Sequence, residues 1–310
     1  MSIINYKQIK ELFKKIVFKI KNNKVRYVSL REKFVNFINT KNLVYEITDL
    51  DKGTVLKYKN SDTLFILGSG SSIEEVTEKQ WDIIAKNDSL AFNWFIYHKF
   101  IPKFYHIEYD RSLFFREFQK SAIKKRAFDY RNTVIFVHHI ARKRGMHPRF
   151  MPDFFPFNPK CCFYKYPNII KKPTIQPLTA EDFKNGFQIR GCLNLMLYIA
   201  YKMNYKNIVL MGVDLLNHIY FYDDYEKYPD AQWMERYNYN WADKETRKNV
   251  LYAGLKIDKN GKIYDPRKGR RPFHEIILAI NQYVFEPKNI KLYIGTKKSL
   301  LSNFLPLYSF

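Results

Sequence analysis

The sequence of 310 residues contains little cysteine, glycine or proline. The three cysteines, Cys161, Cys162 and Cys192, are too few for a disulfide framework. Because Cys161 and Cys162 are adjacent, they also lack the spacing of a metal site, and a reducing compartment is expected. With only 11 glycines and 13 prolines, the chain is neither collagen-like nor rich in flexible linkers.

Long apolar runs are missing as well. A membrane-spanning helix needs about 20 consecutive apolar residues, and no such run exists. Residues 3–20 instead place apolar side chains at helical spacing between lysines, which predicts a basic amphipathic helix and excludes a cleavable signal peptide. This helix would either lie on an anionic membrane surface or pack on the protein with a solvated lysine face. We favour the first interpretation and expect residues 1–60 to form a basic membrane-surface region.

Acidic residues are outnumbered. The chain has 53 Lys and Arg against 30 Asp and Glu, a net charge of +23. An anionic partner is therefore expected: nucleic acid, an acidic membrane surface, or a phosphorylated or acidic sugar. Hydrophobic residues make up 46% of the chain, which is enough for a real core and excludes a disordered protein.

Apolar runs alternate with helical patterns along most of the chain. This alternation predicts an α/β, Rossmann-like fold with a mostly parallel sheet and helices on both faces. Residues 61–310 would form one domain, with a proline-rich lid subdomain inserted at about 141–188. The expected strands are 64–67, 89–94, 104–109, 133–139, 207–213 and 291–295, the expected helices are 74–86, 112–126, 192–203 and 274–285, and a hairpin is expected at 255–264.

A glycine- and serine-rich turn follows the first expected strand. Gly68, Ser69 and Gly70, followed by Ser71 and Ser72, would offer backbone amides and hydroxyls to a phosphate at the start of the next helix. The third glycine of a dinucleotide fingerprint is Ile73 here, so an NAD enzyme is not expected, and no Walker lysine is present. A tight strand-to-helix turn without a ligand remains the alternative.

A second unit begins at Arg190-Gly191-Cys192 and runs through a helix to a strand that ends in Gly212-Val213-Asp214. Asn93 and Asp110 follow two other expected strands. In this order the segments resemble the bacterial lipooligosaccharide sialyltransferases of glycosyltransferase family 42, which use CMP-sialic acid. The resemblance covers about residues 62–305. Departures from the family pattern are Ser69 for Asn, Ser71 for Pro, Asp110 for Asn and Leu216 for a tyrosine.

The resemblance implies roles for particular residues. His274 would be the catalytic base, because a neutral imidazole is available near pH 7. Tyr220, Tyr222 and Arg190 would donate hydrogen bonds to the departing phosphate. His218 is the alternative base, and His274 would otherwise be an ordinary residue at the start of a helix. The implied donor-binding residues are Gly68, Ser69, Gly70, Ser71, Ser72, Asn93, Asp110, Cys192 and Asp214.

The resemblance implies an inverting glycosyltransferase that transfers sialic acid, or a related nonulosonic or keto-sugar acid, to a lipooligosaccharide or capsule glycan. We expect no cofactor and no metal, because Asp49 and Asp51 precede the first expected strand and Asp223-Asp224 fits a solvated loop. The expected partners are the CMP-activated donor, a glycan or glycolipid acceptor and an anionic membrane surface. Nucleic acid is not expected, and a homo-oligomer stays open.

The expected location is the bacterial cytoplasm, at the inner face of the inner membrane. Two alternative functions remain: a glycosyltransferase-like protein of motility or flagellin glycosylation, which the same motifs resemble, and a basic nucleic-acid-binding protein. A non-enzymatic anchoring protein would also fit the charge.

Overall fold

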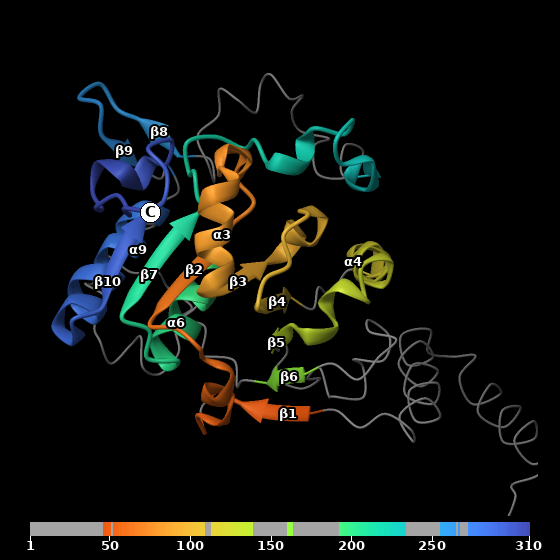
Figure 1. Ribbon diagram of the computed structural model, residues 1–310. Helices are drawn as coiled ribbons and strands as arrows, with labels where there is room; N and C mark the ends of the chain where they lie inside the picture. Colours follow the sequence, from red (N-terminus) through yellow and green to blue (C-terminus); the bar gives the residue numbers. More distant parts are fainter. Residues whose placement is uncertain are drawn as a thin grey trace, which may run out of the picture.

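The computed structural model describes residues 46–50, 52–108, 113–138, 160–163, 192–233, 255–264, 266 and 272–310. Its centre is an eight-stranded sheet in which every neighbouring pair of strands is parallel. The strand order is β1-β6-β5-β4-β3-β2-β7-β10, as Figure 1 shows. The strands are β1 (Glu46–Asp49), β2 (Thr63–Leu67), β3 (Asp88–Phe92), β4 (Phe104–Glu108), β5 (Val134–His138), β6 (Lys160–Phe163), β7 (Asn207–Met211) and β10 (Lys291–Ile294).

Both faces of the sheet are buried. Within β2, Leu64 and Ile66 join one core cluster, and Phe65 and Leu67 join the other, because side chains alternate along a strand. The first cluster packs under α6 (Leu193–Lys202) and α9 (Phe273–Ile280), and the second under α3 (Glu78–Lys86) and α4 (Leu113–Lys125). Figure 1 shows α3 and α6 on opposite sides of β2. The α/β prediction with helices on both faces is confirmed.

The sequence located most elements correctly. The six expected strands appear as β2, β3, β4, β5, β7 and β10, and the hairpin appears as β8 (Lys256–Ile257) and β9 (Ile263–Tyr264). Two short strands were missed. β1 lies within residues 1–60, which were assigned to the basic N-terminal region, so the sheet begins before the expected domain start at residue 61. β6 lies inside segment 141–188, for which a lid was expected. The expected helix over residues 3–20 lies outside the described residues.

The strand order reverses between β2 and β7. From β2 the chain builds β3, β4, β5 and β6 toward one side, while β7 and β10 lie on the other. In open parallel sheets, ligands bind beyond the carboxyl ends of the strands at such a reversal. Because α6 and α9 run back along the sheet before β7 and β10, their N-termini lie at this same carboxyl edge.

No helix within the described ranges is long and apolar enough to cross a membrane. Cys161, Cys162 and Cys192 are buried free thiols.

Candidate active site

The glycine turn after β2 lies directly against the turn after β7. The Gly68 amide donates to the Met211 carbonyl at 2.7 Å, and the Gly70 amide donates to the Gly212 carbonyl at 2.7 Å. A Cβ on Gly68 would collide with the Gly212 carbonyl oxygen. Gly212 itself has a φ of +61°, a left-handed conformation that favours glycine. These glycines allow the two turns to meet at the strand-order reversal.

Asp214 fixes the shape of the Gly/Ser turn. Its Oδ2 accepts a 3.0 Å hydrogen bond from the Ser72 amide and a 3.4 Å bond from the Ser71 hydroxyl, and its Oδ1 accepts a short bond from the Ser72 hydroxyl. Burial raises the pKa of the Asp214 carboxyl, and the bonds from Ser72 and Ser71 oppose that rise. Ser72 is buried as well. Both carboxylate oxygens of Asp214 therefore accept hydrogen bonds that hold the turn. Contacts of Asp214 and Ser72 with a CMP-sugar donor stay a prediction.

The helix after the turn differs from the expected one. A helix over 74–86 was predicted, with its N-terminus beside the turn, but the chain first forms a 3-10 helix, η3 (Ser71–Glu75). The α3 helix begins at Glu78, and its N-cap Thr77 accepts from the Gln80 amide at 3.3 Å in a capping box. The expected helix start was therefore wrong: six residues separate Gly70 from the N-cap Thr77, so the turn does not lie at the N-terminus of α3. Contact of the turn with a phosphate stays a prediction.

The tyrosine-bearing loop after β7 reaches the glycine turn. Gly70 and Tyr220 form an antiparallel bridge, and the Phe221 amide donates to the Ser69 carbonyl at 3.1 Å. Tyr220 stacks on Tyr222, with ring centroids 5.2 Å apart and an interplanar angle of 13°. The structure thus brings Tyr220 and Tyr222 beside Ser69 and Gly70, as the resemblance implied.

Ser69 carries an unusual hydroxyl within this arrangement. Its Oγ is buried and has no hydrogen-bond partner among the residues that the structure describes. Buried polar atoms are nearly always hydrogen-bonded, and an exception needs a reason such as a ligand contact. The hydroxyl lies in the turn predicted to contact the donor.

Asn93 follows β3, beside the glycine turn in the sheet. It adopts a φ of +54°, which Asn tolerates better than most residues, and its carbonyl accepts a short hydrogen bond from the Tyr105 hydroxyl. This conformation begins a 3-10 helix, η4 (Asn93–Tyr97). The half-buried Asn93 therefore lies at the carboxyl edge, as predicted.

His274 lies in the first turn of α9, after the N-cap Pro272. Its ring is 6% exposed and stacks on Phe304, with centroids 5.9 Å apart. Burial lowers the pKa of His274, and the Glu275 carboxylate partly opposes this. Its Nδ1 is buried without a hydrogen-bond partner in the described part of the chain. A neutral imidazole at pH 7 is what a general base requires.

The C-terminal segment links His274 to the turn after β7. Phe304 follows a 3-10 helix, η12 (Leu300–Asn303), whose Leu300 amide donates to the Asp214 carbonyl at 2.8 Å. The Ser299 hydroxyl also donates to the Val213 carbonyl, at 2.5 Å. Ser299 and Leu300 therefore connect the turn after β7 to the segment that carries Phe304.

For the remaining predicted residues, the structure gives a position or an exposure only, or does not describe them. Cys192 is the N-cap residue of α6 and is buried at the carboxyl edge. Arg190 and Asp110 lie outside the described residues. Leu216, which replaces a family tyrosine, is 39% exposed. His218 is half-buried in the loop after β7.

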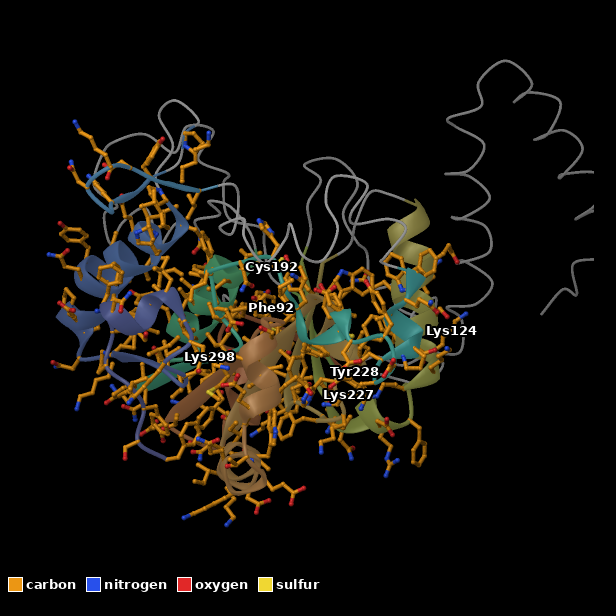
Figure 2. All side chains as sticks on the ribbon, turned by 90° about the horizontal axis from the view of Figure 1, so that it is seen from above. Phe92, Lys124, Cys192, Lys227, Tyr228 and Lys298 are labelled. Carbon is orange, nitrogen blue, oxygen red and sulfur yellow. The ribbon has the colours of Figure 1, made fainter. Side chains whose placement is uncertain are left out.

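The sequence analysis did not identify a polar cluster that links η3 to the loop after β7. Glu74 accepts a 2.5 Å hydrogen bond from the Tyr228 hydroxyl and forms a short ion pair with Lys227. His98 Nε2 lies 3.9 Å from the same carboxylate. Figure 2 shows Lys227 and Tyr228 together on one side of α3, with Lys298, the partner of Glu75, on the other. Glu74 looked like an ordinary helix residue because its partners lie far along the chain.

Metal ligands do not cluster in the described part of the chain: it holds no group of three or more His, Cys, Asp and Glu that could bind a metal ion. Asp223 is buried, and its Oδ2 accepts a 2.8 Å hydrogen bond from the Tyr220 amide. This corrects the expectation of a solvated loop at Asp223, which shapes the tyrosine loop.

Comparison with protein-family models gives no match, and comparison with curated protein sequences gives none. Among solved structures, the chain is similar to the monofunctional alpha-2,3-sialyltransferase Cst-I from Campylobacter jejuni, with 15% identity, a TM-score of 0.45, and coverage of 81% of this chain and 84% of that one. It is also similar to the C. jejuni sialyltransferase CstII in complex with the substrate analogue CMP-3FNeuAc, with 18% identity, a TM-score of 0.38, and coverage of 80% and 85%.

A mutant of the alpha-2,3/8-sialyltransferase CstII matches with 16% identity, a TM-score of 0.40, and coverage of 80% of this chain and 87% of that one. All three structures are sialyltransferases, the class of enzyme that the sequence motifs resemble.

Proposed function

We propose that the protein is a glycosyltransferase that transfers sialic acid, or a related nonulosonic or keto-sugar acid, from a CMP-activated donor to a cell-surface glycan. The observation that carries this proposal is the unpartnered, buried Ser69 hydroxyl, held between the glycine turn and the Tyr220 loop at the strand-order reversal. A donor phosphate would satisfy this hydroxyl once the atoms that cover it move, because the hydroxyl is inaccessible in the free protein.

The proposed reaction needs two kinds of group. A base must take the proton of the acceptor hydroxyl as the new glycosidic bond forms, and hydrogen-bond donors must stabilise the phosphate as its bond to the sugar breaks. His274 supplies the base, since burial keeps its imidazole neutral. Tyr220 and Tyr222 supply donors. Attack from the side opposite the departing CMP inverts the anomeric centre.

The two kinds of group lie on different faces. Tyr222 belongs to the core cluster under α3, whereas Phe273, next to His274, belongs to the cluster under α6 and α9. A donor and acceptor that contact both must therefore lie across the carboxyl edge of the sheet, above β2 and β7. Hydroxyl donors on the phosphate would replace a divalent metal, so we propose that activity is unchanged by EDTA.

Thermal-shift screening with CMP, CDP, UDP and CMP-sialic acid tests the donor class. A ligand that binds the native state raises its melting temperature, so CMP and CMP-sialic acid should give the larger shifts. A stronger shift with UDP, or no shift with CMP, would contradict the proposal. A CMP shift without transfer of sialic acid would support the nucleotide class and call for the same assay with the other keto-sugar acids.

The acceptor is proposed to be a lipooligosaccharide or capsule glycan at the inner face of the inner membrane, with the residues that precede β1 on the membrane surface. Flotation on liposomes with and without residues 1–26 tests this attachment. Equal flotation of both forms would argue against it.

A further inference from the structure

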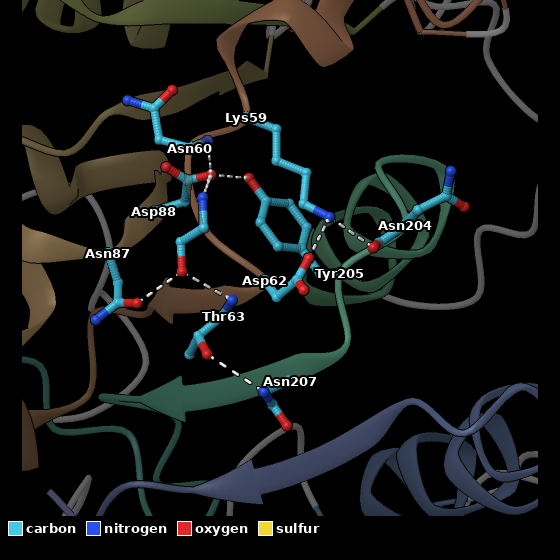
Figure 3. A network of polar contacts seen from close by, with 10 residues as sticks. Lys59, Asn60, Asp62, Thr63, Asn87, Asp88, Asn204, Tyr205 and Asn207 are labelled. Carbon is cyan, nitrogen blue, oxygen red and sulfur yellow. Dashed lines mark hydrogen bonds and ion pairs between the residues drawn. The ribbon is translucent and has the colours of Figure 1, made fainter.

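The amino edge of the sheet, opposite the candidate active site, forms one continuous rim. The Lys206 amide donates to the Asp62 carbonyl at 2.9 Å, the Lys291 amide to the Lys206 carbonyl at 2.8 Å, and the Val134 amide to the Lys103 carbonyl at 2.9 Å. Figure 3 shows its centre, where strand-start residues around Asp88 are hydrogen-bonded. We call the following residues the basic rim: 57–62, 86–88, 99–103, 124–133, 202–207 and 286–291.

Positive charge is concentrated on the basic rim. It holds thirteen Lys and Arg against four acids, Asp62, Asp88, Asp129 and Glu286. The other described residues together contain more Asp and Glu than Lys and Arg. Among the residues that the structure describes, charge is therefore polarised along the strand direction, with the positive end away from the candidate active site. The rim cations are Lys57, Lys59, Lys86, Lys99, Lys103, Lys124, Lys125, Arg126, Arg131, Lys202, Lys206, Lys288 and Lys291.

Several rim cations lie over aromatic rings. Lys288 Nζ lies 5.5 Å from the Tyr201 ring centroid, and Lys59 Nζ lies 4.9 Å from that of Tyr205 while also pairing with Asp62 at 3.0 Å. An aromatic face orients a cation without cancelling its charge, as a carboxylate would. Of the four rim acids, Asp88 is fully buried and pairs with Lys103 at 2.6 Å. The rim therefore presents a net positive surface.

One apolar side chain projects from this surface. Phe128, between α4 and β5, is 74% exposed, the highest value among the exposed large hydrophobic residues of the described chain. The Arg131 guanidinium lies 3.8 Å from its ring centroid, and Lys124 and Lys125 are exposed nearby in the sequence. An aromatic side chain flanked by cations is typical of protein surfaces that contact lipid headgroups.

We propose that the basic rim binds an anionic membrane surface, with Phe128 reaching the headgroup layer. Lysines, which are hydrated point charges suited to a diffuse anionic surface, make up eleven of the thirteen cations. Single-stranded nucleic acid would require further exposed rings for base stacking, and the rim offers one. This inference extends the proposed membrane attachment to the folded domain and does not depend on the transferase activity. Because the rim and the candidate active site lie at opposite edges of the sheet, a membrane-linked acceptor would have to extend past the side of the domain to reach the site.

The test uses the full chain and compares two triple variants with the same change in charge. The rim variant carries Lys206→Glu, Lys288→Glu and Lys291→Glu, and the control carries Lys256→Glu, Lys259→Glu and Lys262→Glu on the β8–β9 hairpin. All six lysines are exposed. Co-sedimentation is measured with phosphatidylcholine vesicles with and without phosphatidylglycerol, and melting temperatures confirm that both variants fold.

Each lysine near an anionic bilayer strengthens binding roughly fivefold, so the rim variant should bind anionic vesicles at least about tenfold more weakly. The control should stay within about twofold of the unaltered chain, because its lysines lie away from the rim. Phe128→Ser should weaken binding to the same vesicles and leave its salt dependence unchanged.

Three results would overturn the proposal: no binding of the unaltered chain to anionic vesicles, equal losses in the rim and control variants, or full binding by the rim variant. RNA binding is measured by gel shift. If the rim variant loses RNA binding but keeps vesicle binding, the partner of the rim is nucleic acid and not a membrane. The CMP thermal shift of the rim variant should be unchanged, so failure here stays separate from failure of the proposed function.

Discussion

The Gly70 amide donates a 2.7 Å hydrogen bond to the Gly212 carbonyl and so fastens the turn after β2 to the turn after β7. The Asp214 side-chain bonds to Ser71 and Ser72 and the bridge between Gly70 and Tyr220 also join these two turns and the loop that follows the second. The candidate active site is therefore one contact surface between segments far apart in sequence. Its shape depends on close backbone approach.

Gly70→Ala should disrupt this contact. A Cβ at Gly70 would lie 2.6 Å from Asp214 Cγ and 2.8 Å from the Gly212 carbonyl oxygen, so backbone or carboxylate must move. Overpacking of this kind costs about 1–3 kcal/mol of stability. We expect lower stability in urea denaturation and a smaller CMP thermal shift. Gly261→Ala is the control: a Cβ there has no neighbour within 4 Å, so CMP binding should be kept. An unchanged CMP shift in Gly70→Ala would contradict the role of the turn.

His274→Ala should lower the rate of transfer by about 10²-fold or more, because a general base contributes about that factor. His218→Ala tests the alternative base in the same assay. If His218→Ala causes the larger loss, the assignment of the base passes to His218. CMP thermal shifts of both variants should stay near that of the unaltered chain, since the base acts on the acceptor.

Glu74→Gln should weaken binding of the CMP-sugar donor, although Glu74 itself is not expected to contact the donor. The carboxylate ties η3 to Lys227 and to the Tyr228 hydroxyl, and thereby sets the spacing between the glycine turn and the tyrosine loop. We expect a higher KM for the CMP donor and a smaller change in kcat. Glu75→Gln is the matched control, because Glu75 pairs with Lys298 on the outer side of η3. Equal KM values for both variants would show that the Glu74 ion pair is only structural.

The sequence was sufficient for the strands of the sheet centre, because continuous apolar runs bounded by Gly, Asn or Asp mark buried parallel strands. It was insufficient for β6, a four-residue strand within a segment rich in proline and aromatic residues. It also placed Gly68, Gly70 and Asp214 at the correct edge, since residues that follow parallel strands share that edge.

The sequence could not predict which side chains of separate loops form hydrogen bonds with one another. Ser72 and Asp214 lie 142 positions apart, so no local pattern shows that Asp214 binds the turn. The same holds for Glu74 and Tyr228, which are 154 positions apart.

Acid should destabilise the fold through two buried histidines. Burial lowers the pKa of His98 to about 4 and that of His106 to about 3, against an ordinary value of 6.5. The unfolded chain therefore takes up protons below pH 6.5 while the native state does not, and stability falls as pH falls. By pH 5 the loss is about 2 kcal/mol for each histidine.

Urea denaturation at pH 7.5 and pH 5 measures this loss. His98→Asn keeps an acceptor for the Phe100 amide, which His98 Nδ1 now binds at 3.1 Å, and removes one titration. The variant should therefore lose about 2 kcal/mol less between the two pH values. An equal loss in the variant and the unaltered chain would exclude His98 as a source.

Asp88→Ala should lower stability and leave the candidate active site unaffected. Fully buried Asp88 accepts hydrogen bonds from the Tyr205 hydroxyl at 2.7 Å and the Asn60 amide at 2.9 Å, and pairs with Lys103 at 2.6 Å. Removing the carboxylate leaves these three donors without their acceptor, at a cost of about 3 kcal/mol. Because Asp88 begins β3 at the amino edge, the CMP thermal shift at a permissive temperature should persist. Loss of CMP binding in a folded Asp88→Ala protein would show that the two edges of the sheet are coupled.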